Sequence, residues 1–144
     1  AIQYLNPQRI GHGVRAVESS EVIQMVYERG ITLEVCPTSN IHTGVVRGLS
    51  QHPLIDLFNL RLYVTLNTDD PSVSDTTLSD EYVVAVSDLG LAPQLIYAML
   101  RHSVDAAFIP AEERTWLREM IRNSLWQWPG AVDCFDGVNS GVFL

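Results

Sequence analysis

The amino-acid sequence predicts an α/β fold with about three parallel strands, flanking helices and further helices at the C-terminal end. Short apolar stretches with strand character alternate with stretches in which apolar residues recur at helical spacing. With 144 residues, the chain is long enough for one ordinary domain and too short for two. An apolar content of 47% can supply a core, and a charged content of 18% argues against a disordered chain.

The first strand and helix are expected in the N-terminal part of the chain. The strand is predicted at Gln8–His12 and ends in Gly-His-Gly. Ser20 is expected to cap the helix that follows, because its hydroxyl can accept a hydrogen bond from the first turn. Gly30 ends this helix. Its apolar stripe consists of Val22, Ile23, Val26 and Tyr27.

Two more strands continue the alternation. The second is predicted at Ile31–Cys36, where Pro37 ends it. The polar stretch Thr38–His52 is expected to be a loop, and Pro53–Asn59 a short helix with proline in its first turn. The third strand is predicted at Arg61–Asn67.

Helices are expected after a loop at Thr68–Thr76. Thr77 can cap the first of them, with Asp80 completing a weak capping box. The helical periodicity of apolar residues is lost after Asn123. Residues 124–144 are therefore expected to be a loosely ordered tail, or sequence foreign to a domain formed by residues 1–123. The three expected helices lie at Leu78–Leu89, Pro93–Phe108 and Ala111–Asn123.

Charge and cysteine content exclude several classes of function. A net charge of −8 argues against binding nucleic acid through its phosphates. All nine basic residues are arginines, which excludes a Schiff-base or P-loop lysine within this sequence. Cys36 and Cys134 form neither a disulfide scaffold nor a zinc ribbon, and they fit a reducing, cytoplasmic setting. No apolar run approaches the roughly 20 residues that span a bilayer, so no membrane partner is expected.

Polar residues follow the ends of the predicted strands. His12 lies between two glycines, and Asp69 and Asp70 follow the third strand. Functional groups of parallel α/β folds gather at the carboxyl ends of the strands, so we expect these three side chains to face one cavity. A structural histidine and a solvated Asp-Asp-Pro turn are the alternatives at this point.

Structural roles are expected for the other candidate side chains. Glu34, inside the second strand, needs a partner if it is buried, and an arginine is expected. Cys36 has no nearby base and is expected to be a small buried hydrophobe. Solvated, capping or other structural roles are expected for His42, His52, His102 and, beside the helix dipole, Asp80 and Glu81.

Six strings, in order and at suitable spacing, resemble the C-terminal part of the adenosine deaminase family. The resemblance covers about Gln8 to Asn123 and implies the C-terminal portion of a (β/α)₈ TIM barrel. It also implies zinc-dependent hydrolytic deamination of adenosine, a small purine nucleoside, to inosine and ammonia. The strings are RIGHG at Arg9–Gly13, LEVCPTSN at Leu33–Asn40, TGVV at Thr43–Val46, TLNTDDP at Thr65–Pro71, SDEY at Ser79–Tyr82 and AAFIPAEER at Ala106–Arg114.

The resemblance implies a role for each strand-end residue. Asp69 matches the zinc-ligating aspartate, which also helps to orient the attacking hydroxide. His12 matches the histidine that orients and electrostatically supports that hydroxide. Asp70 matches the aspartate that binds N7 of the purine, and burial would raise its pKa toward the protonated form that donates. Gly11 resembles the adenosine-acting branch, while adenine-acting relatives often carry aspartate there, so an adenine or other aminopurine deaminase is an alternative.

The sequence also departs from the family's pattern. It contains no His-x-His pair, no third zinc histidine and no proton-donating glutamate in a His-Ala-Gly-Glu-like string. We therefore expect a fragment with an incomplete zinc site that is inactive alone, and self-association through unpaired sheet edges. Two alternatives are a catalytically silent half-barrel that serves interaction or regulation, and a doubly wound binding domain, for which no G-x-G-x-x-G string is present.

Overall fold

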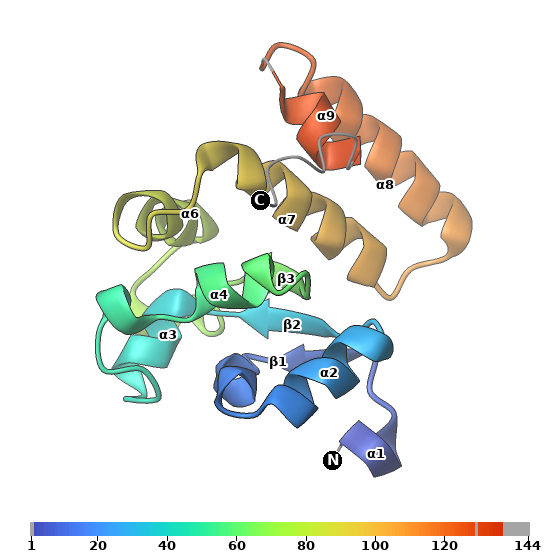
Figure 1. Cartoon of the computed structure of the whole chain (residues 1–144). Helices are drawn as coiled ribbons and strands as arrows, with labels where there is room; N and C mark the ends of the chain where they lie inside the picture. The colour runs from blue at the N-terminus through green and yellow to red at the C-terminus, as the bar shows by residue number, and fades with distance from the viewer. Residues whose placement is uncertain (1, 129, 137–144) are drawn as a thin grey trace. The chain divides into compact units, whose positions relative to one another are not determined.

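The structure is a computed structural model that describes residues 2–128 and 130–136. The chain divides into two compact units, Ala1–Leu91 and Ala92–Leu144. The strands belong to the first unit, and the second is helical (Figure 1).

The first unit is built on a three-stranded parallel sheet, as predicted. Its strands are β1 (Arg9–Gly11), β2 (Thr32–Val35) and β3 (Tyr63–Leu66), in the order β1-β2-β3. The register pairs Gly11 with Glu34 and Val35 with Leu66, so the carboxyl ends of the strands lie at one edge. The structure therefore confirms three adjacent parallel strands and places their polar ends together.

Helices connect the strands of the first unit. Helix α2 (Ser20–Glu28) leads from β1 to β2, and α4 (Leu54–Asn59) leads to β3. The cap of α2 is Ser19 rather than the predicted Ser20, because the Ser19 hydroxyl accepts the hydrogen bond of the Val22 N–H. The remaining helices of this unit are α1 (Ile2–Leu5), α3 (Pro37–His42), α5 (Pro71–Ser74), α6 (Leu78–Ser87) and the 3-10 helices Val14–Glu18 and Leu49–Gln51.

Two of these helices lie where the sequence predicts loops. Helix α3 falls in the expected loop Thr38–His52, and α5 in the expected loop Thr68–Thr76. Both begin with a proline at the first helical position, where its missing N–H costs nothing. They are too short to show an apolar period, which explains why the pattern missed them. The capping box at Thr77 is confirmed in both of its hydrogen bonds.

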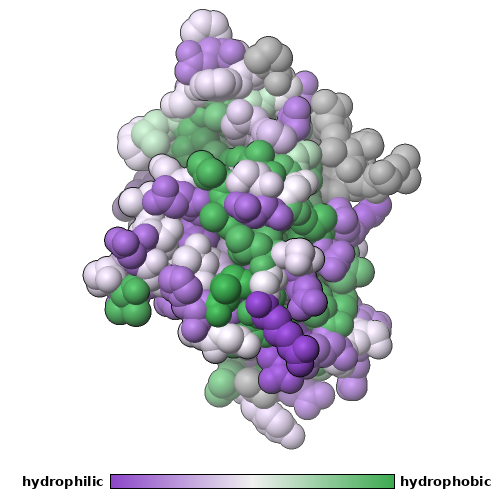
Figure 2. Space-filling model, turned by 90° about the vertical axis from the view of Figure 1, so that its left-hand side faces the viewer, coloured by the Kyte–Doolittle hydropathy of each residue, from purple (hydrophilic) through white to green (hydrophobic). Residues whose placement is uncertain are grey.

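The core of the first unit lies around the central strand. Leu33 and Val35 of β2 are fully buried, as is Val64 of β3. Leu54 and Leu57 of α4 are also fully buried. Some apolar side chains are exposed at the surface, and Figure 2 shows them interspersed with polar side chains.

The second unit contains α7 (Pro93–Ala106), α8 (Ala111–Ser124) and α9 (Ala131–Asp136). Its core contains Leu125, Ala131 and Phe135, against which Tyr97 packs. Helix α9 lies within residues 124–144, for which the sequence pattern predicted no helix. A single pair of buried side chains one turn apart, Ala131 and Phe135, is too short a pattern to predict it. Residues 129 and 137–144 of the expected tail lie outside the described residues.

No helix in the described part of the chain is both long and apolar enough to cross a membrane.

Candidate functional site

A cavity of about 420 Å³ lies at the carboxyl ends of the three strands. Residues from the end of every strand line it. They include Gly11, His12, Glu34, Cys36, Asn67 and Asp69. The sheet edge that the sequence marks with polar residues is thus hollow in the structure.

His12 is placed at this edge by an unusual backbone turn. Its φ is 58° and that of Gly13 is 67°, so two successive residues adopt the left-handed conformation. A Cβ atom at Gly13 would lie 2.7 Å from Cδ2 of Leu33, so the turn requires glycine at that position. The His12 N–H donates to the Glu34 carbonyl oxygen at 2.8 Å, which fixes the turn against β2.

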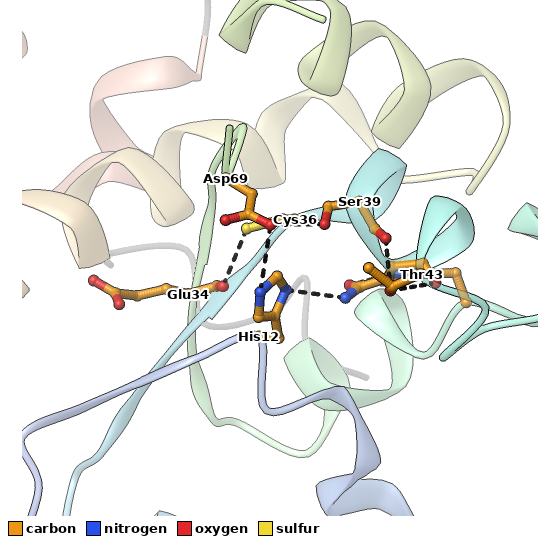
Figure 3. Close-up of polar contacts among 8 residues, drawn as sticks. His12, Glu34, Cys36, Ser39, Thr43 and Asp69 are labelled. Atoms are coloured by element: carbon orange, nitrogen blue, oxygen red, sulfur yellow. Dashed lines mark hydrogen bonds and ion pairs between the residues drawn. The ribbon is translucent and has the colours of Figure 1, made fainter. Parts of the chain in front are cut away.

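The His12 and Asp69 side chains point toward each other (Figure 3). Nε2 of His12 lies 3.7 Å from Oδ2 of Asp69, and both side chains are about two-fifths exposed. The Ser39 hydroxyl, on α3, donates to the same Asp69 oxygen at 2.7 Å. Ser39 was absent from the sequence predictions, although it stands in the PTSN string directly after the second strand.

Asp70 does not line this cavity, contrary to the prediction. Its Oδ1 accepts hydrogen bonds from the Ser72 hydroxyl at 2.6 Å and from the backbone N–H groups of Ser72 and Val73. The carboxylate is therefore the N-cap of α5. The Ser72 side chain, with the backbone donors, lowers the pKa of Asp70, whereas burial was expected to raise it. The local Asp-Pro-Ser sequence thus recruits the side chain for the helix start.

Glu34 and Cys36 have the structural roles predicted for them. Glu34 pairs with Arg9 at 3.0 Å, although its side chain is about one-third exposed rather than buried. Burial raises the pKa of the Cys36 thiol to about 12, and the Asp69 carboxylate adds to the effect. The thiol is therefore protonated near neutral pH and is a poor nucleophile.

Two buried polar residues stand behind His12. Asn40 is 1% exposed and its Nδ2 lies 3.0 Å from Nδ1 of His12. His52 is 7% exposed and its Nε2 lies 3.1 Å from Oδ1 of Asn40. Burial lowers the pKa of His52 to about 4. His52 is therefore not solvated. It has the capping role that was the other predicted alternative, because its ring accepts the N–H of Leu54, the first residue of α4. His42 is exposed, as its solvated alternative predicted.

Glu81 has a larger role than its expected interaction with the helix dipole. It is fully buried and its Oε2 accepts the backbone N–H of Thr38 in α3 at 3.2 Å. Its Oε1 accepts the Thr76 hydroxyl at 3.4 Å. The carboxylate thereby joins the first turn of α6 to the helix that carries Ser39 and Asn40.

The described residues offer too few ligands for a complete zinc site. No group of three or more His, Cys, Asp or Glu side chains within residues 2–128 and 130–136 can hold a metal ion. His12 and Asp69 are two such groups, whereas a protein zinc site normally has at least three. Asp69 fits the part of one carboxylate ligand, since Ser39 already orients its carboxylate at the cavity.

The sequence of the chain is similar to those of known deaminases. The sequence model of the adenosine deaminase family matches residues 1–124. The adenosine deaminase of Serratia proteamaculans is 39% identical over 122 residues, which are 85% of this chain and 37% of that protein. The adenine deaminase of Sinorhizobium fredii is 40% identical over 116 residues, 79% of this chain and 36% of that protein.

The fold is similar to that of solved deaminases. The crystal structure of an adenine deaminase from Arthrobacter aurescens superposes with a TM-score of 0.81 and 26% identity. The superposition covers 87% of this chain and 38% of that one. The three strands and their helices therefore form part of a TIM barrel, and the chain spans little more than a third of the length of these relatives.

Proposed function

Because the chain belongs to the adenosine deaminase family, we propose that it supplies one part of an active site that hydrolyses the 6-amino group of adenosine. The products are inosine and ammonia. The observation that carries the proposal is the approach of His12 Nε2 to Asp69 Oδ2, at 3.7 Å, in the cavity at the strand ends. Gly11 supports adenosine over adenine, because it resembles the adenosine-acting branch of the family. Overall identity does not distinguish the two substrates, since curated relatives of both kinds are about equally identical to this chain.

Asp69 is proposed to be the metal-binding carboxylate of this chain. The Ser39 hydroxyl holds its Oδ2, so the carboxylate has a fixed direction before any ligand arrives. Zinc bound there would supply an electrophile that lowers the pKa of a bound water toward about 7. The other ligands would come from parts of the barrel that the described residues do not include.

His12 is proposed to act on the attacking oxygen by electrostatic support. Its ring lies between Asn40 on one side and Asp69 on the other, and its Nε2 faces the cavity. A positioned hydrogen-bond donor at this place stabilises negative charge as the oxygen attacks C6 of the purine. Asp70 stays a proposed purine contact only if its carboxylate leaves Ser72 when substrate binds, because Ser72 holds it at the start of α5.

A fusion protein tests the proposal. The N-terminal part of the Serratia proteamaculans adenosine deaminase, which this chain does not match, is joined to the chain to complete the barrel. We expect the fusion to bind zinc and to release inosine and ammonia from adenosine faster than hypoxanthine from adenine. Faster turnover of adenine would favour the alternative aminopurine deaminase. A folded, zinc-loaded fusion that acts on neither purine would overturn the proposal and favour a silent interaction module.

A further inference from the structure

A row of hydrogen bonds leads from the backbone of α4 to the cavity. It begins at the Leu54 N–H, which lies 3.1 Å from Nδ1 of His52. It continues from Nε2 of His52 to Oδ1 of Asn40 at 3.1 Å, and from Nδ2 of Asn40 to Nδ1 of His12 at 3.0 Å. It ends where Nε2 of His12 faces Asp69. Each link constrains the direction of the next.

The direction of the first link is fixed by the backbone. An N–H group can only donate, so Nδ1 of His52 must accept and cannot carry a proton. Burial keeps the ring neutral near pH 7, because it lowers the His52 pKa to about 4. A neutral imidazole carries one proton, which therefore sits on Nε2 of His52.

The second link fixes the amide of Asn40. Since Nε2–H of His52 donates, the Asn40 atom that faces it must be the carbonyl oxygen Oδ1. Rotating the amide by half a turn would place two donors against each other at a residue that is 1% exposed, where water cannot replace the lost bonds. The NH₂ group of Asn40 is therefore held toward His12.

The third hydrogen bond determines which ring nitrogen of His12 carries the proton. An amide NH₂ only donates, so Nδ1 of His12 is an acceptor in this arrangement. We infer that Asn40 and His52 are positioning residues that hold the proton of neutral His12 on Nε2, so that the ring presents an N–H to Asp69 and the cavity. The ring then serves as a donor at Nε2 rather than as a base.

The catalytic meaning of this arrangement rests on the proposed function, whereas the tautomer itself can be observed in the chain alone. A lone pair on Nε2 would face the Asp69 carboxylate and repel it. An N–H there attracts the carboxylate and can also stabilise negative charge on an attacking oxygen. Asn40 and His52 do not line the strand-end cavity, and their hydrogen bonds reach it through the His12 ring.

Histidine nitrogen NMR on the 144-residue chain tests the inference directly. At about pH 8, above the ordinary histidine pKa of roughly 6.5, neutral rings report which nitrogen is protonated. We expect both His12 and His52 to have a proton on Nε2 only. Exposed His42 serves as the internal reference, because a solvated ring exchanges between its two tautomers. A His12 ring with a proton on Nδ1, or with the same mixture as His42, would overturn the inference.

Two variants test the Asn40–His12 and His52–Asn40 hydrogen bonds separately. Asn40→Asp places an acceptor against Nδ1 of His12 and is expected to move the His12 proton to Nδ1. His52→Phe removes the anchor, which frees the Asn40 amide and is expected to give a mixture at His12. His42→Phe is the matched control and should leave His12 unchanged. An unaltered His12 spectrum in both variants, with native circular dichroism, would refute the inference; should both fail to fold, the spectrum of the parent chain decides.

Activity of the fusion protein then gives an independent readout. Asn40→Asp in the fusion is expected to lower kcat by about 10²–10³-fold, with KM and zinc content little changed, because the ring no longer offers a hydrogen-bond donor to the attacking oxygen. An inactive parent fusion would count against the proposed function alone, because the NMR result does not depend on turnover. An unchanged kcat in a variant whose His12 proton has moved would refute the role of the tautomer in catalysis.

Discussion

His12 and Asp69 approach to 3.7 Å although they follow strands that are not neighbours, β1 and β3. Each adopts a left-handed backbone conformation, with φ of 58° and 62°. Such a conformation is uncommon for residues other than glycine and is held by the surrounding structure, often at functional sites. The two side chains meet above the end of the central strand, as parallel strands arrange functional groups.

Replacing Ser39 by alanine is expected to weaken zinc binding by the fusion protein. The substitution removes the 2.7 Å hydrogen bond that orients Asp69. Loss of such a supporting bond typically costs about 10–100-fold in metal affinity. Zinc titration with a competing chelator measures the change, and Ser50→Ala, at an exposed serine, is the control. Equal affinities in the two variants would show that Ser39 does not orient a zinc ligand.

Asp70→Asn is expected to lower turnover by the fusion protein while leaving zinc binding largely unchanged. Asp70 lies outside the cavity and caps α5, so its loss does not remove a metal ligand. An amide also caps a helix, which keeps α5 formed. Zinc content and the kinetics with adenosine and with 7-deazaadenosine, which lacks N7, measure both effects. If the two substrates respond equally to the substitution, Asp70 acts through α5 and does not contact N7.

Acid is expected to destabilise the first unit through His52. Its pKa is lowered to about 4 in the folded chain, so the unfolded chain binds a proton first as the pH falls. The stabilisation is present above about pH 6.5 and is lost between about pH 6.5 and 4, by on the order of 3 kcal/mol. Denaturant unfolding of the parent, His52→Phe and His42→Phe chains across this range measures it. The decline should be smaller in His52→Phe only; equal declines in all three would contradict the assignment.

Self-association of the chain is expected from its sheet edges. Among the described residues, β1 and β3 each pair with β2 alone, which leaves one edge of each strand unpaired. Unpaired edges recruit further strands. Light scattering at increasing concentration should show a rising mass, and the fusion protein is the control, because its barrel covers the edges. A chain that stays monomeric at high concentration would argue against this.

The isolated chain is expected to bind no stoichiometric zinc and to show no measurable deamination. His12 and Asp69 alone provide fewer than three ligands in the described part of the chain. Metal analysis of the chain after dialysis against zinc, with an assay for inosine, measures both quantities. One tightly bound zinc per chain, or measurable inosine, would contradict this prediction, because Ala1, Pro129 and residues 137–144 add no His, Cys, Asp or Glu side chain.

The sequence predicted those parts of the fold in which a pattern repeats. Helix α8 carries its apolar residues over fourteen positions, and the prediction missed its end by one residue. Helices α3, α5 and α9 have six residues or fewer, so no period develops. The proline that starts α3 and the aspartate and proline that start α5 are local signals, which could have been recognised at Pro37, Asp70 and Pro71.

The candidate site was predictable where it depends on strand ends. The placement of His12 and Asp69 follows from the parallel sheet, because His12 stands directly after β1 and Asp69 three residues after β3. The pairing of Asn40 with His52 depends on the path of the irregular segment between α3 and α4, which no periodicity records. Asp70 was misplaced because its nearest partner, Ser72, competes with the cavity for its carboxylate.

The role of Asp69 is tested by comparing turnover of the fusion protein with and without its carboxylate. Zinc content and the rate of inosine formation from adenosine are measured for the parent fusion and for Asp69→Ala, with Asp56→Ala, at an exposed aspartate of α4, as the control. We expect that only Asp69→Ala loses both zinc and zinc-dependent turnover. Unchanged zinc content and turnover in Asp69→Ala would show that this chain does not contribute a metal-binding carboxylate to a purine deaminase site.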